Sequence, residues 1–408
     1  MTSPFPHLRL LLLVGVALSG LLAGEAKADS TFVYVNANPS EGPNTVAALR
    51  VINGESTVLS GSPFPTGGLG LALAPGADFT HRVVIARKRN LLFVSNDGSG
   101  SIAVFAVDPT TGSLTAVPGS PFSVGGWGAF SGISLALSPD GNVLYASGKT
   151  IIGLSVAANG ALSEIGASWG FVERVAGIAV NPDNTRLFLG MASGVVALHG
   201  GSAGLTADPP DTLSIGSMAT DLRLSSNGTR LWVTTQTGGI QGYGYDSGSF
   251  SVVPGSPFAS GVSVLGGITV DSSDRFLVAY SPSVPRLLSA RINADGSLGS
   301  STSLSPVFRP LAAALSPAGS VLFAADGLGQ LDAWNAASDG TLIHILGFPL
   351  LTSAQPGFPS VATYPVQNPV PGAPTFMIWA LCALLLGTGW VALRRGRRFG
   401  SALISGAR

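Results

Sequence analysis

Residues 136–147 read ALSPDGNVLYAS, which is an apolar strand, a tight polar turn and a second apolar strand. The same pattern occurs six times along the chain and aligns without gaps. The six copies begin at Val84, Ala136, Ala179, Arg223, Thr269 and Ala314. A repeat of this kind decides the architecture, because each copy is one structural unit that packs against its neighbours.

The spacing of the copies gives the size of the repeated unit. Successive marker residues in the second strand lie 52, 43, 44, 46 and 45 residues apart. A four-stranded antiparallel blade of a β-propeller needs about 40–50 residues. The apolar residues do not recur three and four apart, as they would in a helical repeat. The markers are Phe93, Tyr145, Phe188, Trp232, Val278 and Phe323.

A seventh copy is divided between the two ends of the repeat region. Residues 32–36 (FVYVN) match a second strand, and residues 360–365 (SVATYP) match a first strand. Together they would complete one blade and remove the open edge of the ring. The sequence therefore predicts an all-β, seven-bladed β-propeller over residues 29–365, closed by N- and C-terminal strands that share one blade.

Composition excludes several classes of function. The net charge is zero and only 10% of residues are charged, so the chain lacks the basic surface that nucleic-acid binding needs. The single cysteine, Cys382, lies in a C-terminal apolar segment, which leaves no disulfide framework and no thiolate metal site. His81, His199 and His344 share no metal-ligand spacing and are interpreted as surface or strand histidines. We expect no metal and no cofactor.

The two ends of the chain have the character of targeting segments. Residues 1–28 combine an apolar run with a small-x-small pattern, and are predicted to be a signal peptide cut before Asp29. Residues 366–374 are a Pro-rich linker. Residues 375–393 are free of charge and would span about 28 Å as a helix, enough for a bilayer core. The arginines of 394–408 predict a cytoplasmic tail, with the propeller exported and anchored at the cell envelope.

This C-terminal segment resembles the sorting signals of exported bacterial proteins. Pro374-Thr375 with Trp379 is most similar to the type named for its Ile-Pro-Thr-Leu opening, although Ala373 and Phe376 replace the flanking Ile and Leu. The resemblance implies export and then anchoring, or removal of the tail by a processing protease.

The strings SPDGNVLYAS and FAVDPTTGSLTAVPGSPF resemble the lactonase-like seven-bladed propellers, the family that includes bacterial 6-phosphogluconolactonase. The resemblance spans most of residues 29–365 and implies hydrolysis of a sugar lactone. The string GSPF occurs at Gly61, Gly119 and Gly255, where packing of the repeat explains it better than binding.

Two motifs of active family members are missing from this chain. In those members a Gly-Pro-Arg-His string leads into an inner strand, with the His five residues before the turn proline. The family's Asn-Glu pair after a second strand is replaced by Asn96-Asp97 and Ala325-Asp326, and Phe308-Arg309-Pro310 is the nearest remnant of the His string. The positions that correspond to the His are Ser134, Gly177, Asp221, Gly267 and Ala312.

The loops that form the ligand face of a propeller supply the remaining candidates. Glu173, Arg174 and Arg309 are candidate catalytic residues, because a carboxylate beside a guanidinium binds polar ligands or acts as a base. The alternative is a solvated loop or an ion pair between blades. Candidate ligand-binding residues are Trp127, Trp169, Arg286 and Asp326. The tryptophans would stack on a sugar or a protein partner, or else plug the channel mouth.

Two functions follow from these observations. The first is a monomeric, non-enzymatic binding module at the cell envelope that recognises a protein or glycan. The alternative is a lactonase-type hydrolase that opens a small sugar lactone. A polar cluster of Glu173, Arg174 and Arg309 favours the enzyme, whereas a mouth capped by Trp127 and Trp169 favours the binding module.

Overall fold

The computed structural model describes residues 30–71, 81–124, 132–148, 150–171, 173 and 175–367. These residues form 33 β-strands and no helix, which confirms the all-β prediction. None of them forms a helix suited to crossing a membrane. The predicted signal peptide, transmembrane segment and basic tail lie outside the described residues.

The first two sheets contain five strands each, and the first of them joins both ends of the repeat region. Its strands are β1 (Ser30–Asn36), β2 (Pro43–Ile52), β3 (Glu55–Val58), β4 (Phe64–Leu69) and β33 (Ser360–Pro365). The next sheet contains β5 (Val83–Ala86), β6 (Leu91–Asn96), β7 (Ser101–Val107), β8 (Leu114–Ala116) and β9 (Phe122–Ser123).

A nine-stranded sheet follows, made of two four-stranded groups that the short β17 connects. The first group is β10 (Ser134–Leu137), β11 (Val143–Ser147), β12 (Thr150–Val156) and β13 (Leu162–Gly170). The second group and its connecting strand are β14 (Val175–Val180), β15 (Arg186–Met191), β16 (Val195–Gly201), β17 (Gly204–Leu205) and β18 (Asp211–Leu213).

Three further sheets complete the repeat region. One contains β19 (Ala219–Leu224), β20 (Arg230–Thr235), β21 (Gly239–Asp246), β22 (Ser249–Val252) and β23 (Phe258–Ala259). Another contains β24 (Gly267–Val270), β25 (Phe276–Ser281), β26 (Arg286–Ile292) and β27 (Leu298–Leu304). The last contains β28 (Ala312–Leu315), β29 (Val321–Ala325), β30 (Gln330–Ala336), β31 (Leu342–His344) and β32 (Leu350–Leu351).

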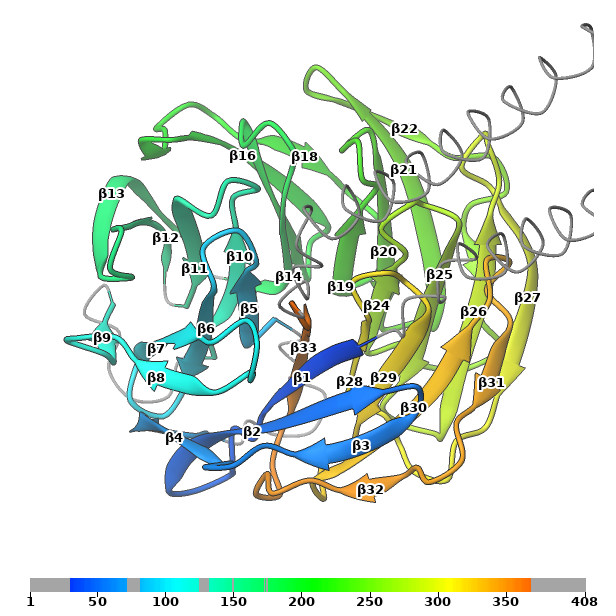
Figure 1. Ribbon diagram of the computed structural model, residues 1–408. Coiled ribbons are helices and arrows are strands. Elements are labelled where there is room, and N and C mark those ends of the chain that lie inside the picture. Colours follow the sequence, from blue (N-terminus) through cyan, green and yellow to red (C-terminus); the bar gives the residue numbers. More distant parts are fainter. Residues whose placement is uncertain are drawn as a thin grey trace, which may run out of the picture. The chain divides into compact units, whose positions relative to one another are not determined.

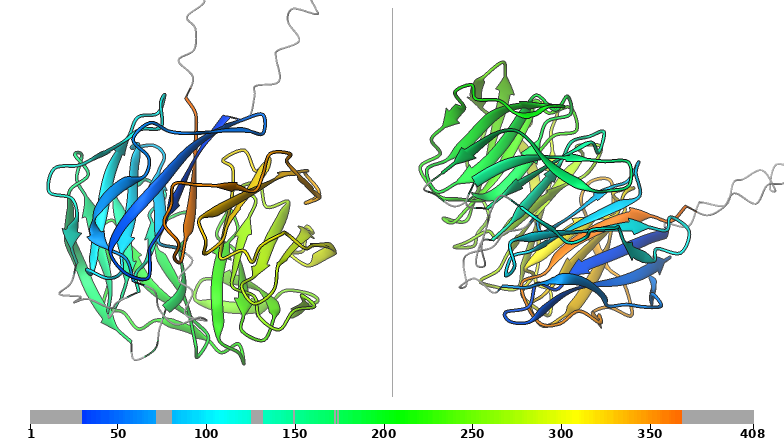
Figure 2. Two further views of the ribbon diagram at one scale, coloured as in Figure 1. Left: turned by 90° about the horizontal axis from the view of Figure 1, so that it is seen from below. Right: turned by 90° about the vertical axis from the view of Figure 1, so that its left-hand side faces the viewer.

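The innermost strands of these sheets surround a common axis (Figure 1). Strands β5, β10, β14, β19, β24, β28 and β33 contact one another in that order, and β33 returns to β5. The terminal strands β1 and β33 pair antiparallel, from Thr31 opposite Pro365 to Asn36 opposite Ser360. Figure 2 shows this pairing as the blue N-terminal strand beside the orange C-terminal strand.

Apolar second strands make up most of the core between the sheets. Every residue of β6, β11, β25 and β29 is buried. All six marker residues are buried too, including Trp232, the largest of them. A strand covered on both faces has a nearly continuous apolar sequence, which is why these segments lack a clear alternation of polar residues.

The GSPF strings serve the sheets themselves. In three sheets the serine hydroxyl of this string accepts a hydrogen bond from a backbone N–H of the third strand. Ser62 accepts from Ala48 at 2.9 Å, and Ser120 accepts from Val104 at 2.9 Å. The third case is Ser256, which accepts from Gly242 at 3.0 Å. The string therefore recurs because it fastens the end of the outer strand to the sheet.

Candidate functional site

A cavity lies at the loop face, which we define as the end of the ring where β14, β19, β24 and β28 begin. Its volume is about 450 Å³. The walls combine the starts of inner strands with the turns that follow second strands, and they are mainly apolar. They include Ala176, Met218, Thr220, Gln236, Arg309 and Phe358. We call this space lobe 1.

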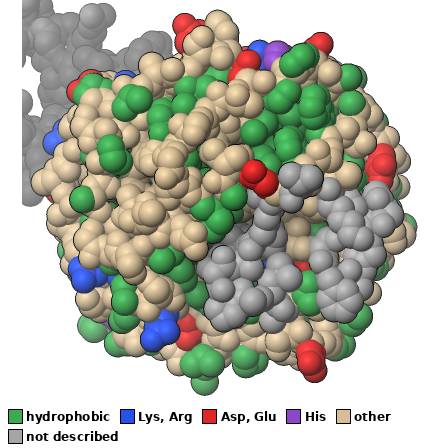
Figure 3. All heavy atoms as spheres, turned by 180° about the vertical axis from the view of Figure 1, so that it is seen from behind, with side chains coloured by type: hydrophobic (Ala, Val, Ile, Leu, Met, Phe, Trp, Pro, Cys, Tyr) green, Lys and Arg blue, Asp and Glu red, His purple; other side chains and the backbone are tan. Residues whose placement is uncertain are grey.

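A second space of about 710 Å³ adjoins it, and we call it lobe 2. Pro282, Arg309, Leu311 and Phe358 line both spaces, so they form the wall between the lobes. Lobe 2 also includes Val307, Leu328 and the predicted site residue Asp326. On the face shown in Figure 3, charged side chains are few and lie mostly towards its edge.

A histidine and an aspartate that are 140 residues apart in sequence meet in the ring, and neither of them lines a lobe. His81 immediately precedes the sheet that begins with β5, and Asp221 follows Thr220 of the lobe 1 wall in β19. Nε2 of His81 lies 2.7 Å from Oδ1 of Asp221. The carboxylate favours the tautomer that has the proton on Nε2, because a carboxylate accepts hydrogen bonds. Arg223 Nη1 lies 3.4 Å from Nδ1 of the same ring.

Two further groups hold Asp221 in place. Arg223 Nη1 donates to Asp221 Oδ1 at 3.0 Å and also contacts the His81 ring. The backbone N–H of Ile268 donates to Asp221 Oδ2 at 3.0 Å. Both carboxylate oxygens therefore have partners in a site where an unpaired charge would be costly. The His81 side chain is 10% exposed.

Burial and the neighbouring charges set the protonation of this pair. Burial lowers the pKa of His81, and Arg223 lowers it further, against the opposing effect of Asp221. Burial acts to raise the pKa of Asp221, but Arg223 and His81 outweigh it and leave the pKa below its usual value. At neutral pH the pair is therefore a neutral imidazole oriented by a carboxylate, which is an arrangement able to accept a proton.

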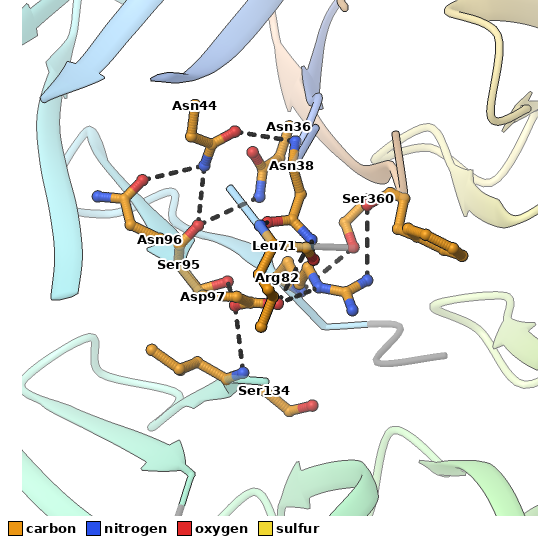
Figure 4. A network of polar contacts seen from close by, with 12 residues as sticks. Asn36, Asn38, Asn44, Leu71, Arg82, Ser95, Asn96, Asp97, Ser134 and Ser360 are labelled. Carbon is orange, nitrogen blue, oxygen red and sulfur yellow. Dashed lines mark hydrogen bonds and ion pairs between the residues drawn. The ribbon is translucent and has the colours of Figure 1, made fainter. Parts of the chain in front are cut away.

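The neighbouring Arg82 belongs to a separate buried network, shown in Figure 4. Arg82 Nε donates to Asp97 Oδ2 at 2.7 Å, and both side chains are almost fully buried. Asp97 Oδ1 accepts from the hydroxyl of Ser95 at 2.9 Å and from the backbone N–H of Ile133 at 3.2 Å. Asp97 thus connects the sheet of β5 and β6 to the start of β10.

Asparagines extend this network to the sheet that contains β1 and β33. Asn44 Nδ2 donates to Asn96 Oδ1 at 3.0 Å, and Asn44 Oδ1 accepts from the backbone N–H of Asn38 at 2.8 Å. The backbone N–H of Arg82 donates to Ser360 Oγ at 3.2 Å. The Asn96-Asp97 pair, which takes the place of the family's Asn-Glu, therefore joins sheets to one another.

Of the predicted site residues that the structure describes, only Arg309 and Asp326 line a common space, which is lobe 2. Asp326 Oδ1 accepts from the backbone N–H groups of Leu328 at 2.9 Å and Gln330 at 2.7 Å, so this carboxylate stabilises a turn. Glu173 Oε2 accepts from the backbone N–H of Ser193 at 2.8 Å, and Glu173 lines neither lobe. Arg174 lies outside the described residues.

The structure places Trp169 in a strand, which corrects the expectation of a loop. Trp169 lies in β13 opposite Ile151, and its indole N–H donates to the carbonyl of Thr206 at 2.8 Å. Its ring stacks on Phe171 with centroids 6.5 Å apart. Arg286 begins β26 and its guanidinium contacts the Ser303 hydroxyl. Neither Trp169 nor Arg286 lines a lobe, and Trp127 lies outside the described residues.

A second histidine–aspartate pair provides a useful contrast. His344 Nε2 lies 2.7 Å from Asp332 Oδ1, the same distance as in the His81 pair. The His344 side chain is 42% exposed at the outer strand β31, and it lines neither lobe. The His81 pair differs because its aspartate adjoins the wall of the cavity.

The sequence pattern favoured a surface or strand position for His81, and it did not predict the pairing of His81 with Asp221. One signal was present: Asp221 is a carboxylate within the inner strand ATDLRL, and a buried carboxylate needs a partner. Asp221 also occupies one of the positions where the resembled family places its histidine. The identity of the partner was not visible, because His81 belongs to a different repeat.

Comparisons with solved structures find similar β-propeller folds. No family model matches the chain, and the search of curated proteins found no match. A periplasmic gluconolactonase of Pseudomonas aeruginosa is similar in structure, with a TM-score of 0.64 and 19% identity over 83% of this chain and 100% of that one. A candidate 6-phosphogluconolactonase of Bacteroides uniformis has a TM-score of 0.66 and 14% identity, over 82% of this chain and 99% of that one.

A similar candidate 6-phosphogluconolactonase of Bacteroides fragilis has a TM-score of 0.65 and 14% identity, over 83% of this chain and 99% of that one. These similarities establish a β-propeller fold. Identities this low leave the chemistry to be argued from the residues of this chain.

Proposed function

We propose that this protein is a lactonase-type hydrolase whose general base is His81. The observation that carries the proposal is the contact of His81 with Asp221, which follows Thr220 of the lobe 1 wall, in a site whose cavity contains one cationic side chain. The lactonase neighbours support it at the level of the fold. The hydrolase, which the sequence pattern left as the alternative function, thus becomes the first candidate, and the binding module becomes the second.

The proposed reaction uses the groups of the site in order. His81 Nδ1 accepts a proton from a water molecule as the water oxygen attacks the lactone carbonyl. Asp221 stabilises the imidazolium that forms, in the way an orienting carboxylate does in other hydrolases. The ring C–O bond then breaks, and the imidazolium returns its proton to the leaving alkoxide. The product is a hydroxycarboxylate, and Arg309 is the lobe-lining cation suited to its negative charge.

A panel of lactones tests this proposal. Purified protein comprising residues 29–367 is incubated with γ- and δ-lactones, and acid release is followed in a weakly buffered indicator solution. We expect turnover above the spontaneous rate for at least one lactone class. Rates equal to the spontaneous rate across the panel would reject the hydrolase proposal.

A binding module remains the second candidate, because one observation favours it. Among the described residues that line lobe 1, Arg309 is the only charged side chain, and no carboxylate or histidine lines it. Such a wall suits the retention of a ligand. A ligand that binds in this cavity and is recovered unchanged would support this candidate over the hydrolase.

We propose further that the repeat region is a seven-bladed propeller closed by β1 and β33. The ring of inner-strand contacts and the pairing of the terminal strands support this count. The short β17 then bridges two blades and accounts for the nine-stranded sheet. On the evidence of its end sequences, we also propose that the protein is exported and anchored in the membrane as a monomer by residues 375–393.

A further inference from the structure

The two lobes form one divided binding space, because four residues line both of them. Phe358 and Arg309 stand at this division, with Pro282 and Leu311. A ligand whose charged group contacts Arg309 can therefore place the rest of its structure in either lobe. Phe358 is held from behind, since its carbonyl lies 3.5 Å from Nη1 of Arg82 in the buried network.

Exposed apolar side chains line part of lobe 2. Val307 is 78% exposed and Leu328 is 68% exposed, and both line this lobe with Phe308 and Phe358. Apolar side chains gathered around a concave surface, rather than scattered singly, indicate a site for an apolar ligand group. The polar side chains of lobe 2 are Ser40, Arg309, Asp326 and Gln330, and hydroxyl groups of a sugar ring placed against the apolar side chains would have no partners.

The two lobes together contain one cationic and one acidic side chain among the described residues. Arg309 is the only cationic side chain among the described residues that line the lobes, and it forms no hydrogen bond or ion pair with any of them. Asp326 is the only described acidic residue of the lining, and the backbone N–H groups of its own turn donate to its Oδ1. The uncharged polar groups of lobe 1 are Thr220, Gln236 and Ser283.

We propose that this space binds an amphiphile with one anionic or carbonyl head group at Arg309 and an alkyl chain along Val307, Leu328 and Phe358. Applied to the proposed hydrolase, on which this part of the inference rests, the substrate is an alkyl-substituted lactone and the product a hydroxyalkanoate. The binding part does not depend on any turnover.

Calorimetric titration with straight-chain alkanoates of six to twelve carbons tests the binding part, with gluconate as the hydrophilic comparison. Affinity is expected to rise by about fourfold for each buried methylene group. Leu328→Asp should flatten this dependence on chain length. Arg309→Gln should weaken the binding of every alkanoate, and it should weaken the binding of uncharged alkyl lactones less, because a carbonyl group carries no full charge.

Leu346→Asp is the matched control, because Leu346 is 91% exposed and lines neither lobe. This variant should bind the whole series as the wild type does. Gluconate binding as tightly as dodecanoate, or an equal loss of chain-length dependence in Leu328→Asp and Leu346→Asp, would overturn the proposal.

The two proposals fail in different ways. Chain-length-dependent binding without hydrolysis of any lactone rejects the hydrolase and leaves the amphiphile site standing. Hydrolysis that is equally fast for gluconolactone and for alkyl lactones, with no chain-length-dependent binding, rejects the amphiphile site and supports the hydrolase.

Discussion

At the scale of single residues, the two neighbours His81 and Arg82 make contacts with different parts of the molecule. His81 contacts Asp221 in β19, whereas Arg82 is paired with Asp97 after β6. The segment just before β5 therefore carries the titratable His81, which contacts β19, and is held in place by the buried Arg82–Asp97 ion pair. Each pair leads to its own prediction.

We expect the acid limb of kcat/KM against pH to lie below pH 6.5. Burial and Arg223 lower the pKa of His81 from 6.5, so the active neutral form persists to lower pH than in a free imidazole. Activity should be constant through neutrality and fall as pH drops through the folded-state pKa. An acid limb at or above pH 6.5 would show that another group is the base.

The stability of the protein should follow the same group. Below pH 6.5 the unfolded chain binds a proton at His81 that the folded chain resists, so the free energy of unfolding should decrease with falling pH in this range. His81→Gln should reduce this slope when unfolding by urea is measured at several pH values. A slope that the substitution leaves unchanged would contradict the pKa direction.

We expect Asp97→Asn to lower the free energy of unfolding by about 3–5 kcal/mol, because the change removes one charge of a buried pair. Arg186→Gln is the control, since Arg186 and Asp211 are 3.4 Å apart and each is about one-fifth exposed. Its cost should be smaller than that of Asp97→Asn, because the Arg186 and Asp211 side chains keep some contact with solvent. Urea unfolding followed by tryptophan fluorescence measures both, and equal costs would contradict the role of the Arg82–Asp97 network.

At the scale of elements, β33 is the strand on which the closure of the ring depends. It pairs with β1 and contacts β5 and β28, and its Tyr364 is fully buried among residues that include Phe32 and Leu92. A protein ending at Ser353 should therefore lose cooperative unfolding. Tyr364→Ala should cost about 3–5 kcal/mol, as other large-to-small changes of buried aromatic residues do.

The control for this truncation is a protein ending at Gln367, which keeps β33 and should unfold at the same urea concentration as the full-length chain. Thermal and urea unfolding followed by circular dichroism compare the three proteins. An unchanged midpoint for the protein ending at Ser353 would contradict the closure by β33.

The hairpins of the repeats were predictable because their signal is local. Each hairpin combines two apolar runs with a turn. The second strand is apolar along its whole length because neighbouring sheets cover both of its faces. Strand β13 was missed around Trp169. It contains Gly166 and Gly170, and its pairing with β12 is irregular between Ile151 and Gly153, which breaks the simple pattern of a strand.

At the scale of the whole molecule, the candidate site is assembled from repeats that are distant in sequence. The spacing of the repeats predicted the propeller, but it carries no information about which side chains meet at the axis. His81 and Asp221 are 140 residues apart, and the lobes combine segments that run from Ser40 to Phe358. Glu173 and Trp169 were predicted at the ligand face from their loop position alone. In the structure Glu173 accepts a hydrogen bond from the backbone of Ser193, and Trp169 donates one to the backbone of Thr206.

The export proposal is tested by cell fractionation in a bacterial host. We expect the full-length protein in the membrane fraction with Asp29 as its first residue, because the signal peptide is removed and residues 375–393 remain in the bilayer. A protein ending at Gln367 should appear in the soluble exported fraction. A product that begins at Met1 and stays in the cytoplasm would contradict the proposal.

The measurement that most directly tests the central claim compares His81→Gln with His344→Gln on the best lactone of the panel. Both histidines lie 2.7 Å from an aspartate, but only Asp221 of the two aspartates is next in sequence to a residue that lines lobe 1, which is Thr220. If His81 is the general base, its substitution should lower kcat by about a hundredfold or more, while His344→Gln keeps the wild-type rate. Equal rates for the two variants, with both folded, would contradict the claim.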